Sequence, residues 1–190
     1  LAGITSSNDG SHYALTRALA EGRGFEISPY LSFTENLDYA LRGDLRFSDR
    51  PPGTAFLAAP LYALSALLPP PRMGMRGLPS KHDPDNPRLL YALLLPVLAA
   101  SLSAHLLFYL LRVHWRLSLW AAVLTTLAFA LGTMTWKYGS LLYSHAPSGL
   151  LVLGAAALLL RRAGSAAGRD SFALGLLLGG SLLIEYTNVA

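Results

Sequence analysis

The sequence predicts an all-α fold, a polytopic bundle of transmembrane helices with a large first external loop that contains juxtamembrane helices. Hydrophobic residues make up 53% of the 190 residues and charged residues only 14%, whereas a soluble domain carries about 25%. Eighteen charged residues lie in 1–88 and eight in the remaining 102. This break divides the chain into an external loop, 1–88, and a transmembrane region, 89–190. The chain has no cysteine, which excludes disulfides and thiolate metal sites.

Long apolar runs in the second part predict about four transmembrane helices. The runs 89–111 and 138–160 have 23 residues each and 117–136 has 20, and a bilayer core needs about 20. The run from 171 qualifies when it continues to residue 190, with Glu185 as its one charge. The alternative is a buried helical core in a soluble protein, and three such runs in succession argue against it.

Basic residues set the expected orientation. They gather at two joints between runs, with Arg112 and Arg116 at the first and Arg161, Arg162 and Arg169 at the second. The positive-inside rule makes these joints cytoplasmic. The joint that holds Lys137 and His145 is then external, as is the loop 1–88, and the last run delivers Glu185 to the external side.

The segment 54–68 tests this orientation. It is apolar but only 15 residues long, and prolines precede it, interrupt it at Pro60 and follow it. A crossing here would reverse every later run and remove the charge bias. We therefore expect an interfacial helix at the outer surface, with a tilted crossing as the alternative.

A polar cluster opens the external loop. Asn8 and Asp9 precede a segment, 13–21, with apolar residues at helical spacing, and Gly22 and Gly24 follow it. Asp9 is therefore expected just before a short amphipathic helix. It is either an N-cap or a general base at a membrane-surface active site.

A second element is Arg50, followed directly by Pro51-Pro52-Gly53 and the apolar segment. The prolines fix an extended turn that holds Arg50 at the N-terminus of a helix. The guanidinium and the helix dipole both favour an anion. The alternative is an arginine that reaches to lipid headgroups.

These motifs resemble a known family. The resembling residues are Asn8-Asp9 with Tyr13, Arg50-Pro51-Pro52-Gly53, Arg88 before the first run, and Tyr143-Ser144-His145-Ala146-Pro147. Their order resembles the N-terminal part of a C-superfamily glycosyltransferase, closest to family 39 and its relatives, the protein O-mannosyltransferases and the lipid A aminoarabinose transferases. The chain starts with Leu and ends without a polar tail, so we expect it to be a fragment of a longer protein.

The resemblance implies an integral membrane enzyme that moves a sugar, with inversion, from a polyprenyl-phosphate donor to an acceptor on the external face. It implies Asp9 as the base on the acceptor hydroxyl and Arg50 as the contact to the donor phosphate. Beside the resemblance, the cation of Lys137 in the second external joint is expected to add to the phosphate pocket. Relatives often have Asp-Glu at the first position, where this chain has Asp9-Gly10. Many also have an acid in the second external joint, where this chain offers His145.

Other expectations are broader. Candidates for substrate or metal contacts are His12, Tyr143, His145 and Glu185. No cofactor is expected with certainty, and a divalent metal ion stays open. The expected partners are the donor, membrane lipid and an acceptor that is a lipid, glycan or protein; scattered arginines exclude nucleic acid. We expect a bacterial inner membrane protein with a periplasmic site. The alternatives are a secondary transporter and a non-catalytic membrane scaffold.

Overall fold

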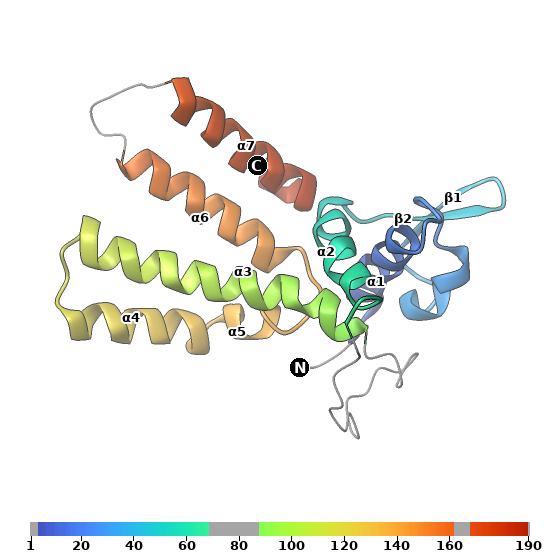
Figure 1. Ribbon diagram of the computed structural model, residues 1–190, viewed down its shortest axis with the longest axis horizontal. Coiled ribbons are helices and arrows are strands. Elements are labelled where there is room, and N and C mark those ends of the chain that lie inside the picture. Colours follow the sequence, from blue (N-terminus) through green and yellow to red (C-terminus); the bar gives the residue numbers. More distant parts are fainter. Residues whose placement is uncertain (1–3, 69–87, 162–167, 190) are drawn as a thin grey trace. The chain divides into compact units, whose positions relative to one another are not determined.

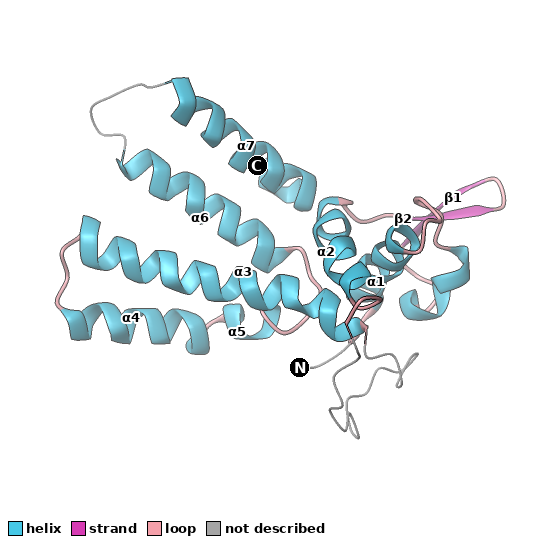
Figure 2. Cartoon of the chain, in the orientation of Figure 1, coloured by secondary structure: helices cyan, strands magenta, loops and turns pink. Residues whose placement is uncertain are grey.

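The computed structural model describes residues 4–68, 88–161 and 168–189 and is mostly helical, as the sequence predicts (Figure 1). Among these residues the strands form a single two-stranded hairpin (Figure 2). The elements in chain order are α1 (Ser7–Ala20), η1 (Ser28–Thr34), β1 (Tyr39–Arg42), β2 (Leu45–Ser48), α2 (Gly53–Leu64), α3 (Leu89–Tyr109), η2 (Leu110–His114), α4 (Leu119–Gly132), α5 (Met134–Tyr138), α6 (His145–Arg161), α7 (Gly168–Ile184) and η3 (Tyr186–Val189).

Packing divides the chain into two compact units. The first unit comprises Leu1–Val97 and Ser140–Tyr143, and the second comprises Leu98–Gly139 and Ser144–Ala190. The division falls inside α3, and a short later segment belongs to the first unit. The sequence places a boundary at residue 88, between an external loop and a transmembrane region. That boundary concerns position in a membrane rather than compact packing, so it stays a prediction.

Helix α1 is the centre of the first unit. The helix starts at Ser7 rather than after Asp9, because the Asp9 side chain accepts hydrogen bonds at the helix start. It ends before Gly22, which adopts a positive φ of 75°, as the glycines predict. Tyr13 is fully buried, and its ring packs edge-on against Phe33 at 5.0 Å and against Tyr62 at 6.0 Å. These aromatic contacts hold η1 and α2 against α1.

Glu21 joins the same three elements through polar contacts. Its carboxylate accepts hydrogen bonds from the Tyr30 hydroxyl at 2.5 Å, Arg17 Nε at 2.9 Å and the Tyr62 hydroxyl at 3.1 Å. Burial alone would raise the pKa of Glu21, but these donors hold it below its usual value. Burial and the neighbouring carboxylate raise the pKa of Tyr30. The ionised carboxylate is therefore part of the packing.

The hairpin is a feature that the sequence interpretation did not include. Strands β1 and β2 are antiparallel, with Tyr39 opposite Ser48 and Arg42 opposite Leu45. Gly43 adopts a φ of 61° in the tight turn between them. The hairpin ends at Ser48, directly before the segment that carries Arg50.

Helix α2 has its apolar side chains on the exposed face. It is shorter than the expected 54–68, and its buried residues are small or polar apart from Tyr62. The large residues point outward, with Phe56 41% and Leu57 46% exposed. The helix itself contains no charged residue. A soluble protein usually places its apolar stripe inward, and the expected position of α2 at a membrane surface stays a prediction.

The predicted apolar runs form helices with different bounds. The segment Leu89–His114, which comprises α3 and η2, is the one described helical segment long and apolar enough to cross a membrane. Helix α4 has 14 residues, because the Thr133 side chain accepts from the backbone of Thr135 and starts α5. Helix α6 has 17 residues and begins at His145, so that Pro147 lies in its first turn, where a missing N–H is tolerated. Three of the expected spans are therefore shorter helices than the runs suggested.

Candidate functional site

The Asp9 carboxylate is fully engaged and buried. Its Oδ1 accepts from the backbone N–H and the hydroxyl of Ser6, both at 2.8 Å. Its Oδ2 accepts from the backbone N–H of Thr5 at 2.8 Å and the Thr5 hydroxyl at 3.2 Å. A carboxylate has about four acceptor positions, and Asp9 is 0% exposed. Ser6, rather than Asp9, is therefore the N-cap residue, and Asp9 is the third residue of the helix, whose carboxylate completes a capping box. A role as base would require one of these donors to turn away.

Tyr143 supports this cap from a distant part of the chain. Its hydroxyl lies 2.7 Å from the Ser6 hydroxyl. Because Ser6 donates its proton to Asp9, Tyr143 is the donor in this contact. In the structure Tyr143 therefore has a structural role in the first unit. Its expected contact with substrate stays a prediction. His12, another expected contact residue, is also buried in α1.

Gly10 lies where the structure leaves no room for a side chain. A Cβ on Gly10 would lie 1.8 Å from the carbonyl oxygen of Phe33, far inside the contact limit for any side chain. Close packing of η1 on α1 therefore requires glycine here.

Arg50 is held by two carboxylates. Its Nη2 lies 2.5 Å from Oδ1 of Asp38, and its Nε lies 3.3 Å from Oδ1 of Asp49. Its backbone N–H donates to the Ser48 hydroxyl at 3.2 Å. The guanidinium is thus fixed in position just before α2, while the acids offset its charge. The sequence interpretation did not include either acid as a partner.

A hydrogen-bond network joins α1 to this segment. The Ser11 hydroxyl donates to the backbone carbonyl of Asp38 at 2.8 Å and lies 2.7 Å from the Ser48 hydroxyl. Two buried side-chain oxygens near the starts of the two helices, Oδ1 of Asn8 and Oγ1 of Thr54, have no hydrogen-bond partner among the described residues. Buried polar atoms without partners are uncommon, and each calls for an explanation such as a bound water, an ion or a functional role.

The second unit contains a separate polar cluster. Nδ1 of His145, at the start of α6, lies 3.3 Å from Oε2 of Glu185, just beyond the end of α7. The Ser144 hydroxyl donates to the same carboxylate oxygen. The sequence singled out His145 and Glu185 separately, and the structure brings them together. Ser144 lies within a quoted motif, but the sequence assigned it no role.

A further contact fixes the same two helix ends. Nδ2 of Asn188 donates to the Ser148 hydroxyl at 2.6 Å and to the backbone carbonyl of Ser181 at 3.1 Å. The polar residues after α7 therefore fasten its C-terminal end to the first turn of α6. Sequence spacing could not reveal this, because 40 residues separate Asn188 from Ser148.

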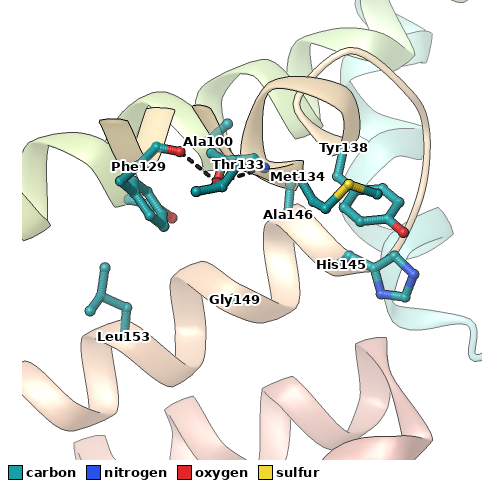
Figure 3. A pocket seen from close by; sticks show the side chains of 11 residues that line it. Ala100, Phe129, Thr133, Met134, Tyr138, His145, Ala146, Gly149 and Leu153 are labelled. Carbon is teal, nitrogen blue, oxygen red and sulfur yellow. Dashed lines mark hydrogen bonds between the residues drawn. The ribbon is translucent and has the colours of Figure 1, made fainter. Parts of the chain in front are cut away.

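A cavity of about 400 Å³ lies beside this cluster (Figure 3). Figure 3 shows Tyr138 and His145 at one end and Phe129 and Leu153 towards the other. The rings of Tyr138 and His145 are 4.5 Å apart. The lining residues are Ala100, Ser103, Phe129, Thr133, Met134, Thr135, Tyr138, His145, Ala146, Gly149 and Leu153. Lys137, the expected second phosphate contact, precedes Tyr138 in α5 but does not line this cavity.

The described residues offer no group of three or more histidine, aspartate or glutamate side chains arranged to hold a metal ion. Comparisons with family models, curated proteins and solved structures find no match to this chain. Any function proposed for the candidate sites must therefore be argued from the geometry of their residues.

Proposed function

We propose that the chain is part of an integral membrane glycosyltransferase that moves a sugar from a polyprenyl-phosphate donor to an acceptor on the external face of a bacterial inner membrane. The observation that carries the proposal is the network of the first unit. Ser11 and Ser48 join α1 to the segment where Arg50 is fixed, and Asn8 and Thr54 are left with buried, unsatisfied oxygens.

The polytopic bundle is part of the proposal. Large apolar side chains are exposed along all four long helices of the second part, among them Leu98, Leu124, Val152 and Leu176. Such residues need an apolar surrounding, which lipid provides. Helices α4 and α6 are about 21 and 26 Å long at 1.5 Å per residue. They span a bilayer core of about 30 Å only with local thinning or with the residues that flank them.

Transfer from a lipid phosphate has two electrostatic requirements. Positive charge develops on the sugar and negative charge on the leaving phosphate as the bond breaks. In the proposal Arg50 contacts the phosphate. Asp49 moves away from the guanidinium to make room, since it is more exposed and more distant than Asp38. Asp9 first holds the start of α1, and it takes the acceptor proton only if a hydroxyl donor turns away.

The transporter alternative makes a different structural demand. Transporters place ionisable groups near the middle of discontinuous helices. In the apolar helices α3, α4, α6 and α7, the described charged residues lie at or near the helix ends, and His105 lies inside α3, four residues before its end. This distribution favours chemistry near a membrane surface, and hence the transferase.

The decisive experiment uses membranes that contain the full-length protein and a polyprenyl-phosphate sugar, with release of polyprenyl phosphate followed by mass spectrometry. Wild-type protein should release it. Arg50→Ala should raise the KM for the donor, whereas Asp49→Asn should lower it by freeing the guanidinium. Arg42→Ala, an exposed arginine on β1, is the matched control and should change nothing. Absence of release from wild-type membranes across several sugar donors would remove the proposal.

A further inference from the structure

Arg50 and Asp38 are joined by more than their ion pair. Nη2 of Arg50 lies 2.5 Å from Oδ1 of Asp38. The backbone N–H of Arg50 donates to the Ser48 hydroxyl at 3.2 Å, and the Ser11 hydroxyl donates to the backbone carbonyl of Asp38 at 2.8 Å. Because the Ser11 proton is used on that carbonyl, Ser48 is the donor in its 2.7 Å contact with Ser11. The three hydrogen bonds therefore run in one direction from Arg50 to Asp38, and the ion pair closes them into a ring.

The backbone at Asp38 fixes the position of its carboxylate. Tyr39 pairs with Ser48 in the hairpin, so Asp38 and Asp49 lie directly beyond the paired residues. Asp38 has a φ of 51°, in the left-handed region that aspartate and asparagine adopt more readily than most residues with a side chain. Ser11, which holds the Asp38 carbonyl, is fully buried in α1. A strained residue persists where surrounding contacts hold it, and such residues gather at functional sites.

The two acids beside Arg50 are held to different degrees. The Asp38 side chain is 21% exposed, whereas the Asp49 side chain is 41% exposed and lies 3.3 Å from Nε of Arg50. A guanidinium carries five N–H donors. It can therefore keep one carboxylate while another anion replaces the second.

We infer that Asp38 is the positioning residue of Arg50. It keeps its pair with the guanidinium while a phosphate oxygen of the donor replaces Asp49, so that the remaining N–H groups meet the phosphate in one orientation. This role rests on the proposed function, in which Arg50 contacts the donor phosphate. It means that Asp38 promotes the reaction even though its negative charge opposes phosphate binding.

The first test needs no sugar transfer. The full-length protein in membranes is treated with p-hydroxyphenylglyoxal, which modifies accessible guanidinium groups. Mass spectrometry then compares the labelling rate of Arg50 with that of Arg23, an exposed arginine after α1. Asp38→Asn should raise this ratio about fivefold, as for the loss of a partly exposed ion pair, since asparagine tolerates the left-handed backbone and removes only the charge. Asp49→Asn should raise it less, and Asp44→Asn in the hairpin turn is the matched control that should leave it unchanged.

A second variant breaks the ring without removing a charge. Ser11→Ala keeps both acids but removes two of the three hydrogen bonds. It should raise the labelling ratio of Arg50 by less than Asp38→Asn does. An unchanged ratio in Ser11→Ala would show that the ring does not hold the guanidinium, whether or not the asparagine variant folds.

The second test measures release of polyprenyl phosphate at several donor concentrations. Asp38→Asn should lower kcat about tenfold through misplacement of the phosphate. It should also lower the KM for the donor, because it removes a negative charge beside the phosphate. In the Arg50→Ala background the same change should have no further effect on kcat, because the group that Asp38 positions is gone. Loss of folded protein would instead lower the activity in both backgrounds and leave KM unchanged.

Two further results would overturn the inference. Equal labelling of Arg50 in Asp38→Asn, Asp49→Asn and the wild type would show that Asp38 does not hold the guanidinium. An unchanged kcat in Asp38→Asn, or a loss that persists in the Arg50→Ala background, would show that Asp38 positions nothing for the reaction. Absence of transfer by the wild type would remove the proposed function, and the labelling comparison would still decide whether Asp38 holds Arg50.

Discussion

The carbonyl oxygen of Phe33 occupies the space that a side chain on Gly10 would need, since a Cβ there would lie 1.8 Å from it. This contact brings η1 onto the first turns of α1 and fixes where Asp9 and its neighbours lie. It also has a direct test, because the steric conflict involves backbone rather than a side chain that can move.

Gly10→Ala should therefore destabilise the full chain by at least about 2 kcal/mol, at the upper end of overpacking effects. The measurement is thermal unfolding in detergent micelles. The matched control is Gly175→Ala in α7, where a Cβ meets nothing within 4 Å; this change should be neutral or stabilising by up to about 1 kcal/mol. Equal unfolding temperatures for Gly10→Ala and wild type would show that η1 does not pack on α1 in this way.

Asp9→Asn should lower stability as well as any transfer activity. An amide offers one oxygen where the carboxylate accepts four hydrogen bonds from Thr5 and Ser6, and its N–H groups would face donors. The expected loss is about 1–2 kcal/mol, as for removal of a helix cap. Asp44→Asn, at the exposed hairpin turn, should have no effect. Full stability with abolished transfer would instead assign Asp9 a purely chemical role.

Glu21→Gln should destabilise the first unit in a pH-dependent way. The pKa of Glu21 is lowered in the folded chain, so the stability that its charge contributes is present above the unfolded pKa and lost as the pH falls through the folded pKa. The difference between wild type and variant should therefore be largest at neutral pH and shrink in acid. Denaturant unfolding at several pH values measures it. A difference that grows towards acid would contradict the three donor contacts.

Single cysteines can test which surfaces lipid covers, because the chain has no native cysteine. Leu57 on α2 and Asp44 in the hairpin turn are both exposed in the structure. If α2 lies in the external surface of the inner membrane, a membrane-impermeant maleimide added to intact cells should label Asp44→Cys and not Leu57→Cys. Arg116→Cys, at an expected cytoplasmic joint, should be labelled only after lysis. Labelling of Leu57→Cys at the same rate as Asp44→Cys would place α2 in water.

Hydrophobic periodicity and local sequence signals predict the helices, but they do not predict the segments that connect them. Gly22 marked the end of α1, and the run from residue 89 gave α3, because both signals depend on a few neighbouring residues. The hairpin was missed, although Gly43-Asp44 between two short alternating segments is a turn signal. The break at Thr133 was missed because an apolar run hides a single capping hydroxyl.

The candidate site residues also show that a sequence does not reveal contacts between distant residues. Asp9 lies in the first turn of α1 rather than before it, and Arg50 lies just before α2 as expected. Their partners Thr5, Ser6 and Asp49 are sequence neighbours that a capping-box pattern and adjacency could have indicated. Only Asp38, twelve residues before Arg50, depends on tertiary packing. His145 and Glu185 were each noted alone, and only the fold pairs them. Contacts between residues tens of positions apart carry no local signal, so one sequence could not supply them.

The first unit includes Ser140–Tyr143 as well as its N-terminal part, with Leu142 in the same hydrophobic cluster as Tyr13. A ribosome therefore releases α1, the hairpin and α2 long before the segment that completes their core. Until residue 143 leaves the exit tunnel, α1 lacks the Tyr143 hydroxyl and its core lacks one wall. Such sequence-distant closure slows folding and exposes apolar surface to chaperones during synthesis.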